Sequence, residues 1–74
     1  MSALSKRLVA LRKARGLSQA AVANESGIAL RTYQYYERGE REPQLSTLIR
    51  LADFYQVSLD ELVGREVPPP AGGG

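Results

Sequence analysis

The segment GLSQAAVANESGIALRTYQYYERG, residues 16–39, contains two short helical patterns separated by a glycine. Ser18 can cap the first helix by accepting hydrogen bonds from backbone N–H groups of its first turn. We expect this helix over residues 18–25, ending near Gly27, because glycine is the usual residue just past a helix end. The second helix is expected over residues 29–37, although Ala29 is a poor cap for it.

The second of these helices has two different faces. Tyr33 and Tyr36 are spaced i, i+3 with Ile28 upstream, which predicts one buried face. A stacking platform for single-stranded nucleic acid is the alternative interpretation of the two tyrosines. The opposite face is mostly polar, and it carries Leu30, Arg31, Gln34 and Tyr35. Two short helices with a glycine-containing turn and a polar outer face on the second have the geometry that places a helix in the major groove of DNA.

Three more helices are expected on either side of this segment. Leu4, Leu8 and Leu11 share one face of a predicted helix over residues 3–14. Ser58 and Glu61 form a capping box for a short helix over residues 59–63. The helix between them, over residues 45–55, has an apolar stripe that predicts a core face made by Leu45, Leu48, Leu51, Ala52 and Tyr55.

The chain is therefore expected to be all-α, a compact bundle of five short helices. With 74 residues it can bury only one core, so we expect one domain over residues 1–66. Residues 67–74 read VPPPAGGG, a composition that cannot pack and predicts a disordered tail or linker.

Composition excludes several classes of protein. Cysteine and histidine are both absent, which rules out a disulfide framework and a zinc finger and removes the usual general base. We therefore expect no catalytic residues, no metal, no cofactor and no small-molecule ligand. Charged residues interrupt every apolar run, so neither a signal peptide nor a membrane span is predicted, and we expect a cytoplasmic protein.

Charge is distributed unevenly along the chain. Residues 1–38 carry seven Lys and Arg against two Glu, whereas residues 39–74 carry three Arg against six acidic residues. A basic half of this kind can face a polyanion, and we predict that it faces DNA while the acidic half faces a second subunit or solvent. The alternative is that these charges only keep the protein soluble.

Several short motifs occur in order along the chain: Leu17-Ser18-Gln19, Ala23, Gly27, Tyr36-Glu37-Arg38-Gly39, Pro43, and Leu48 through Val57-Ser58. With these motifs the sequence resembles the Cro/CI-type (XRE) helix-turn-helix family of phage repressors and bacterial transcriptional regulators. The resemblance covers nearly everything from Leu4 to Gly64. Two departures occur: Ala20 and Ala21 stand where acidic residues are common, and Ala29 stands where a capping Ser or Thr is common.

The resemblance implies a lambda-repressor-like fold and roles for named residues. Arg31 is the strongest candidate base reader, because its fork can bond guanine O6 and N7. Leu30, which is alternatively a scaffold residue, is a candidate for contact with a thymine methyl group. The implied base-reading residues are Leu30, Arg31, Gln34 and Tyr35. The implied phosphate-binding residues are Ser18, Gln19, Thr32, Arg38, Arg41 and Gln44.

The resemblance also implies a structural pair and a dimer. Arg12 and Glu37 are expected to form a partly buried salt bridge, the alternative being two separately solvated charges. Family members dimerise through their last helices, and binding to a palindromic operator as a homodimer is implied. The apolar candidates for that interface are Phe54, Tyr55, Leu59, Leu62, Val63 and Val67, of which some must serve the core.

The expected function is that of a sequence-specific regulator of transcription, of the repressor type, in a bacterial cell or a phage-infected host. Its expected partner is double-stranded DNA, and no membrane is expected to be involved. The alternative is a protein-interaction module on the same fold, such as an antitoxin or an adaptor.

Overall fold

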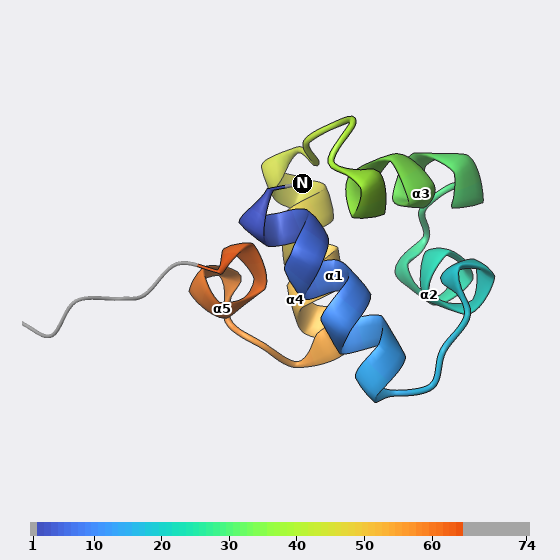
Figure 1. The fold of residues 1–74 in the computed structure, drawn as a ribbon, viewed down its shortest axis with the longest axis horizontal. Helices are drawn as coiled ribbons and strands as arrows, with labels where there is room; N and C mark the ends of the chain where they lie inside the picture. Colours follow the sequence, from blue (N-terminus) through green and yellow to red (C-terminus); the bar gives the residue numbers. More distant parts are fainter. Residues whose placement is uncertain (1, 65–74) are drawn as a thin grey trace, which may run out of the picture.

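The computed structural model describes residues 2–64, which form five helices (Figure 1). This confirms the predicted all-α class, and no strand occurs in the described part of the chain. Val67 and the predicted tail lie outside the described residues. The helices are α1 (Ala3–Ala14), α2 (Gln19–Ser26), α3 (Leu30–Arg38), α4 (Leu45–Tyr55) and α5 (Leu59–Val63).

Serine side chains start three of the five helices. Ser18 accepts a hydrogen bond from the Ala21 N–H at 3.0 Å, and its extended backbone places it just before α2. Ser2 and Ser58 cap α1 and α5 in the same way, and Ser58 completes the predicted capping box with Glu61. Ala29 makes no side-chain cap, so α3 depends on packing rather than on a polar start.

A left-handed residue just past the end lets the chain turn sharply after α2, α3 and α4. Gly27 and Gly39 take this role with φ of 68° and 72°. Behind α4 the role falls to Gln56, whose φ is 55°. In each case the next N–H bonds back to a carbonyl of the last turn, as Ile28 does to Ala23 at 2.8 Å.

The core is made by residues from all five helices. Leu8, Val22, Tyr33, Leu51 and Leu62 are completely buried. α1 packs against α3 and α5, while α4 packs against α5 and α2.

The prediction that Leu45 belongs to the core is wrong, because 64% of it is exposed. Leu45 is the first residue of α4, so it extends the apolar stripe of that helix beyond the part that is covered.

α2 and α3 lie together at one end of the molecule, and α5 lies on the opposite side, with α1 and α4 between them (Figure 1). The outer face of α3 is consequently free of the rest of the bundle. Within residues 2–64, no helix has the length and apolar character that crossing a membrane requires.

The stability of the fold is expected to fall at alkaline pH, because two tyrosine hydroxyls are buried. Burial raises the pKa of Tyr33, and hydrogen bonds with Tyr55 and Glu37 raise it further; burial also raises the pKa of Tyr55. The two hydroxyls lie 3.1 Å apart. A phenol with a raised pKa stabilises the fold below the unfolded value of about 10, and this stabilisation is lost as pH rises beyond it.

We therefore expect Tyr33 and Tyr55 to ionise only as the helices unfold. An alkaline titration that records tyrosinate absorbance and circular dichroism together will detect this. In Tyr33→Phe, this late absorbance change should be smaller. Complete titration of all tyrosines before any loss of helix would contradict the prediction.

Candidate functional site

The two faces of α3 differ sharply in burial. Tyr33, Tyr36 and Glu37 are buried, which confirms that the two tyrosines face inward and leaves no stacking platform. Leu30 and Arg31 are exposed on the other side, and Gln34 and Tyr35 are partly exposed there. The four residues predicted to contact bases are thus all accessible on the outer part of α3.

Tyr35 is surrounded by cationic side chains from α3 and the loop after it. The guanidinium carbons of Arg31, Arg38 and Arg41 lie 6.0, 5.3 and 4.7 Å from the centre of its ring. We call these three arginines the arginine cluster. The Tyr35 hydroxyl also accepts a hydrogen bond from Arg31 Nε at 3.2 Å. The ring attracts each cation through its electron-rich face, so Tyr35 holds the three charges close together.

The charge of this cluster remains available to a polyanion. Arg38 pairs with Glu40 at 3.2 Å, and both side chains are about half exposed. An exposed pair of this kind is weak and is screened by salt, so a phosphate can compete with it. Glu40, which precedes Arg41 in the sequence, is thus paired with Arg38.

The Arg12 and Glu37 side chains, from α1 and α3, form a bidentate ion pair. Arg12 Nε lies 2.6 Å from Glu37 Oε2, and Arg12 Nη2 donates to Glu37 Oε1 at 3.0 Å. The Glu37 side chain is only 4% exposed. Burial by itself raises the Glu37 pKa, but hydrogen bonds from Arg12, Tyr33 and Gln19 together outweigh it and hold that pKa below its usual value.

Gln19 connects this pair to the outer face of α3. Its Nε2 donates to Glu37 Oε1 at 3.0 Å, while its Oε1 accepts from Gln34 Nε2 at 3.1 Å. The sequence predicted Gln19 and Gln34 as separate DNA contacts and gave no sign of this chain of hydrogen bonds.

The remaining predicted phosphate contacts, Ser18, Thr32 and Gln44, differ in exposure and in how their side chains are engaged. Ser18 Oγ is engaged in capping α2, although Ser18 itself is exposed. Thr32 is partly buried on α3. Gln44 is exposed and precedes α4 without a side-chain cap bond.

Arginines of α1 and its C-terminal cap donate hydrogen bonds to other parts of the same chain. Arg7 Nε donates to the Glu61 carbonyl of α5 at 3.1 Å. Arg15 donates to the Phe54 and Tyr55 carbonyls at the end of α4, and its guanidinium lies over both rings. Cations are favourable at helix C-termini, where carbonyl groups lack partners. Fewer cations of the basic half are therefore left to face DNA than the sequence predicted, since Arg7, Arg12 and Arg15 bind other parts of the same chain.

Replacing Arg15 by alanine is expected to lower the free energy of unfolding by about 1 kcal/mol, the usual net size of such hydrogen bonds. The loss follows because the last carbonyls of α4 would lose their cationic donor. Chemical denaturation of Arg15→Ala beside Lys6→Ala, a change at an exposed cation of α1, measures it. Equal stability of the two variants would count against a capping role for Arg15.

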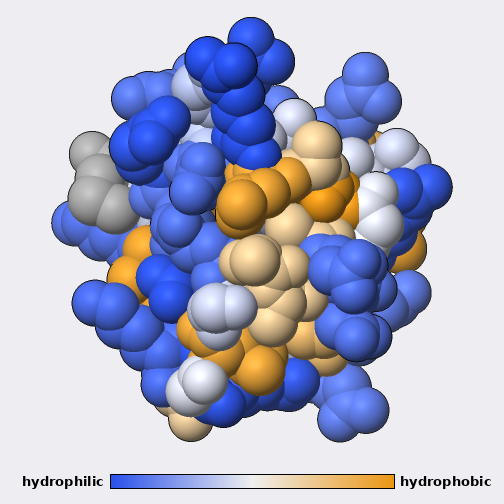
Figure 2. Space-filling view, turned by 90° about the vertical axis from the view of Figure 1, so that its right-hand side faces the viewer, coloured by the Kyte–Doolittle hydropathy of each residue, from blue (hydrophilic) through white to orange (hydrophobic). Residues whose placement is uncertain are grey.

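Hydrophobic atoms are also visible on the end of the molecule that carries α2 and α3, framed by hydrophilic side chains (Figure 2). The exposed apolar residues of this region include Ala20, Ala29 and Leu30, of which Leu30 is 42% exposed. A small apolar surface beside arginine donors suits contact with thymine methyl groups in a major groove.

The structure divides the predicted interface residues of the last two helices. Tyr55 and Leu62 are 1% and 0% exposed, so they serve the core and are not available for a dimer contact. Phe54 and Val63 are partly exposed and Leu59 is exposed, while Val67 lies outside the described residues. The sequence did not single out Ile49, a large apolar residue of α4 that is 43% exposed.

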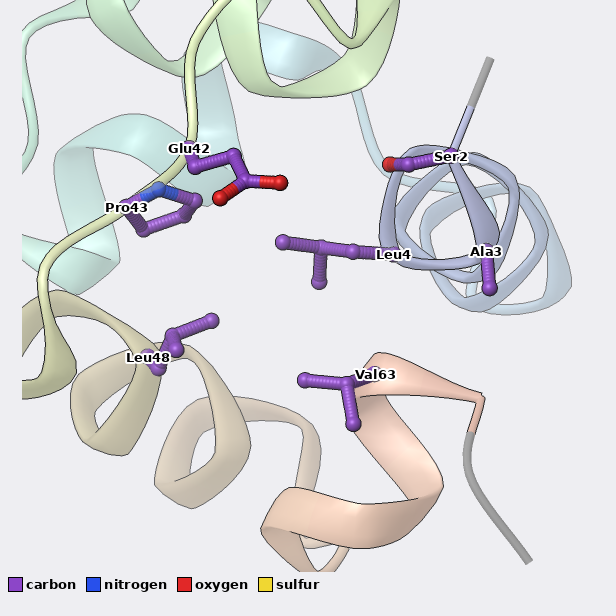
Figure 3. A pocket seen from close by; sticks show the side chains of 7 residues that line it. All are labelled: Ser2, Ala3, Leu4, Glu42, Pro43, Leu48 and Val63. Atoms are coloured by element: carbon purple, nitrogen blue, oxygen red, sulfur yellow. The ribbon is translucent and has the colours of Figure 1, made fainter.

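A shallow apolar hollow of about 330 Å³ lies between the start of α1, the loop before α4, and α5 (Figure 3). Leu4 points into it, and Leu48 and Val63 line the side below it in that view. Glu42 supplies the one carboxylate of the lining. No group of three or more potential metal ligands occurs within residues 2–64.

The family model described as helix-turn-helix matches residues 8–62 of this chain. The cryptic phage CTXphi transcriptional repressor RstR of Vibrio cholerae is 44% identical over 62 residues, covering 84% of this chain and 55% of that protein. The regulator AnsR of Bacillus subtilis is 47% identical over 60 residues, covering 81% of this chain and 52% of that protein. The chain thus spans about half the length of the curated relatives it matches.

Solved structures show the same arrangement of helices. The restriction-modification controller protein C.AhdI from Aeromonas hydrophila superposes with a TM-score of 0.76 at 35% identity, covering 81% of this chain and 91% of that one. A transcriptional regulator from Listeria innocua gives a TM-score of 0.77 at 38% identity, covering 90% and 64%.

Proposed function

Because the chain belongs to the helix-turn-helix family, we propose that it is a transcriptional regulator of the repressor type that binds double-stranded DNA in a sequence-specific manner. The observation that carries the proposal is the outer face of α3. It presents Gln34 together with the arginine cluster, to which Arg31 belongs, on a helix whose inner face is fixed in the core. The relatives named as repressors and regulators support the same role.

In this proposal α3 lies in the major groove and reads base edges with Leu30, Arg31 and Gln34. Tyr35 serves chiefly to organise the arginine cluster, and Arg38 and Arg41 meet the phosphate backbone. Gln19 meets DNA through the N-terminus of α2, where free N–H groups and the helix dipole favour an anion. Ser18, Thr32 and Gln44 flank this surface as further phosphate contacts.

We propose that two copies bind an operator-like palindrome, because one domain of this size covers only a short stretch of groove. The predicted interface residues that remain accessible are Phe54, Leu59 and Val63, and Ile49 joins them. The protein acts in the cytoplasm, without catalysis, cofactor, metal or small-molecule ligand.

Selection of bound duplexes from a random library tests this function. We expect one enriched motif with two-fold symmetry, and affinity for it that falls steeply with salt because phosphate contacts release counterions. A single non-palindromic half-site would contradict the dimer. Absence of any enriched duplex at low salt, with the helical circular-dichroism signal intact, would overturn the DNA-binding role.

One observation favours a second function, that of an antitoxin or adaptor. Leu45 and Ile49 leave apolar surface on α4 that the described chain does not cover. A protein partner on α4 would be recognised by co-purification that Leu45→Ser with Ile49→Ser abolishes, while Arg31→Ala and Gln34→Ala leave it intact.

A further inference from the structure

Glu40 is held beside the arginine cluster by the way in which α3 ends (Figure 1). Gly39 takes the left-handed conformation and turns the chain back toward the helix that it leaves. The N–H of Glu40 then donates to the Tyr35 carbonyl at 2.9 Å, and the N–H of Gly39 donates to the Tyr36 carbonyl at 3.2 Å. These two bonds fix the backbone of Glu40, so its side chain starts within reach of Arg38.

Two contacts join the Glu40 carboxylate to one edge of the Arg38 guanidinium. Arg38 Nη2 donates to Glu40 Oε2 at 3.2 Å, and Arg38 Nε lies 3.2 Å from Glu40 Oε1. A planar guanidinium offers a phosphate the same pair of parallel donors that it offers a carboxylate. The donors that Glu40 occupies in the free protein are therefore among those that a phosphate of DNA would use.

The surroundings favour this pairing while no other anion is present. Arg38 and Arg41 both approach the ring of Tyr35, so their positive charges lie close together. Such cations repel one another, and the carboxylate of Glu40 relieves part of that repulsion. A phosphate of the duplex can do the same, and DNA presents many of them along its backbone. Because the Arg38 and Glu40 side chains are about half exposed, a phosphate can replace the carboxylate without any unfolding.

We propose that Glu40 is an internal competitor for DNA, whose carboxylate occupies Arg38 in the free protein and has to be displaced before Arg38 binds a backbone phosphate. Glu40 thereby lowers the affinity of the arginine cluster for every duplex. This inference rests on the proposed function, in which Arg38 and Arg41 meet the phosphate backbone. Glu40 acts through Arg38 and is not itself a DNA contact.

Binding of Glu40→Gln to the selected operator and to an unrelated duplex tests the proposal. Glutamine keeps the length of the side chain and removes its charge. We expect both affinities to rise by roughly two- to fivefold, the fold-change that corresponds to the loss of one exposed ion pair. This gain should shrink as salt is added, because the charge of an exposed carboxylate is screened.

Glu42→Gln is the matched control. It removes the same charge from the same loop, at an exposed residue that lines the hollow beside the start of α1 (Figure 3). Its affinity for DNA should rise clearly less than that of Glu40→Gln. Arg38→Ala supplies a second control, because it lacks the cation that Glu40 occupies. Adding Glu40→Gln to Arg38→Ala should bring no larger gain than Glu42→Gln brings to the wild-type chain.

Retention on heparin, a sulfated polyanion without bases, separates this inference from the function on which it depends. Glu40→Gln should elute from heparin at a higher salt concentration than Glu42→Gln. Equal behaviour of the two variants on heparin and on duplexes would show that Glu40 contributes only general charge. Weaker binding by Glu40→Gln would show that Glu40 orients Arg38 toward DNA, and either result would overturn the proposal. If the two variants differ on heparin but no duplex binds, the DNA-binding function fails while the competition for anions stands.

Discussion

Replacing Arg12 by methionine is expected to lower the free energy of unfolding by about 3 kcal/mol or more, the usual cost of leaving a buried charge without its partner. Glu37 is 4% exposed and would keep only its weaker donors, Gln19 and Tyr33. Burial would then dominate, and the pKa of Glu37 would rise instead of falling. For a chain of this size the melting temperature should drop by roughly 12 to 24 °C.

The pH dependence gives this prediction a second readout. In the wild-type protein the Glu37 pKa is depressed, so its stabilisation is present above the unfolded value of about 4.3 and is lost as pH falls through the folded value. In Arg12→Met the buried carboxylate is a penalty that protonation removes. The difference in stability between the two proteins should therefore shrink as the solution is acidified.

Matched variants separate the ion pair from general effects of the substitution. Lys13→Met makes the same replacement at an exposed cation of α1 and should cost little. Adding Glu37→Leu to Arg12→Met should recover part of the lost stability, because no unpaired charge is then buried. Denaturation curves in which Arg12→Met matches Lys13→Met would show that the pair does not stabilise the fold.

Arg31→Ala is expected to reduce affinity for the selected operator by roughly 5- to 150-fold, the size of one bidentate base contact. Arg31 is exposed on α3, and the Tyr35 hydroxyl holds its Nε at 3.2 Å. The Nη groups at the end of the fork are the donors left to bond guanine O6 and N7. Quantitative binding assays on the operator and on unrelated duplex DNA measure the specific loss.

Arg31→Lys distinguishes the shape of the fork from its charge. Lysine keeps the cation but presents no planar pair of donors, so we expect it to relax the preference for guanine while retaining nonspecific binding. If Arg31 binds a phosphate instead, both variants will weaken all sequences alike. In that case Arg31→Ala will also reduce the dependence on salt by about one counterion.

The helices were predictable because each has a strong local signal. Ser18, Gly27 and Gly39 mark the ends of α2 and α3, and the structure moves the predicted limits by only one residue. Gln56 shows where such signals stop, because it takes the left-handed conformation that usually indicates glycine. The exposure of Leu45 was missed because periodicity identifies the apolar stripe of a helix. It does not show how much of that stripe the neighbouring helices cover.

The site was less predictable than the fold, because side-chain partners depend on packing between distant segments. The sequence alone indicated which residues face outward on α3. It could not show that Gln19 lies between Glu37 and Gln34, or that Arg15 lies at the end of α4. For the same reason, the summed charge of residues 1–38 did not show which cations are free to meet DNA. A cation adds the same charge to the sum whether it lies in solvent or binds the end of a helix.

The separation of the two faces of α3 bears on how readily this protein can acquire a new target sequence. Leu30 and Arg31 are exposed and lie outside the buried core, so drift or design can exchange them while the scaffold persists. Gln34 is different, because its neighbour Gln19 shares a carboxylate with Arg12. Retargeting is therefore expected to begin at the first turn of the helix and to reach position 34 only when positions 19 and 34 change together.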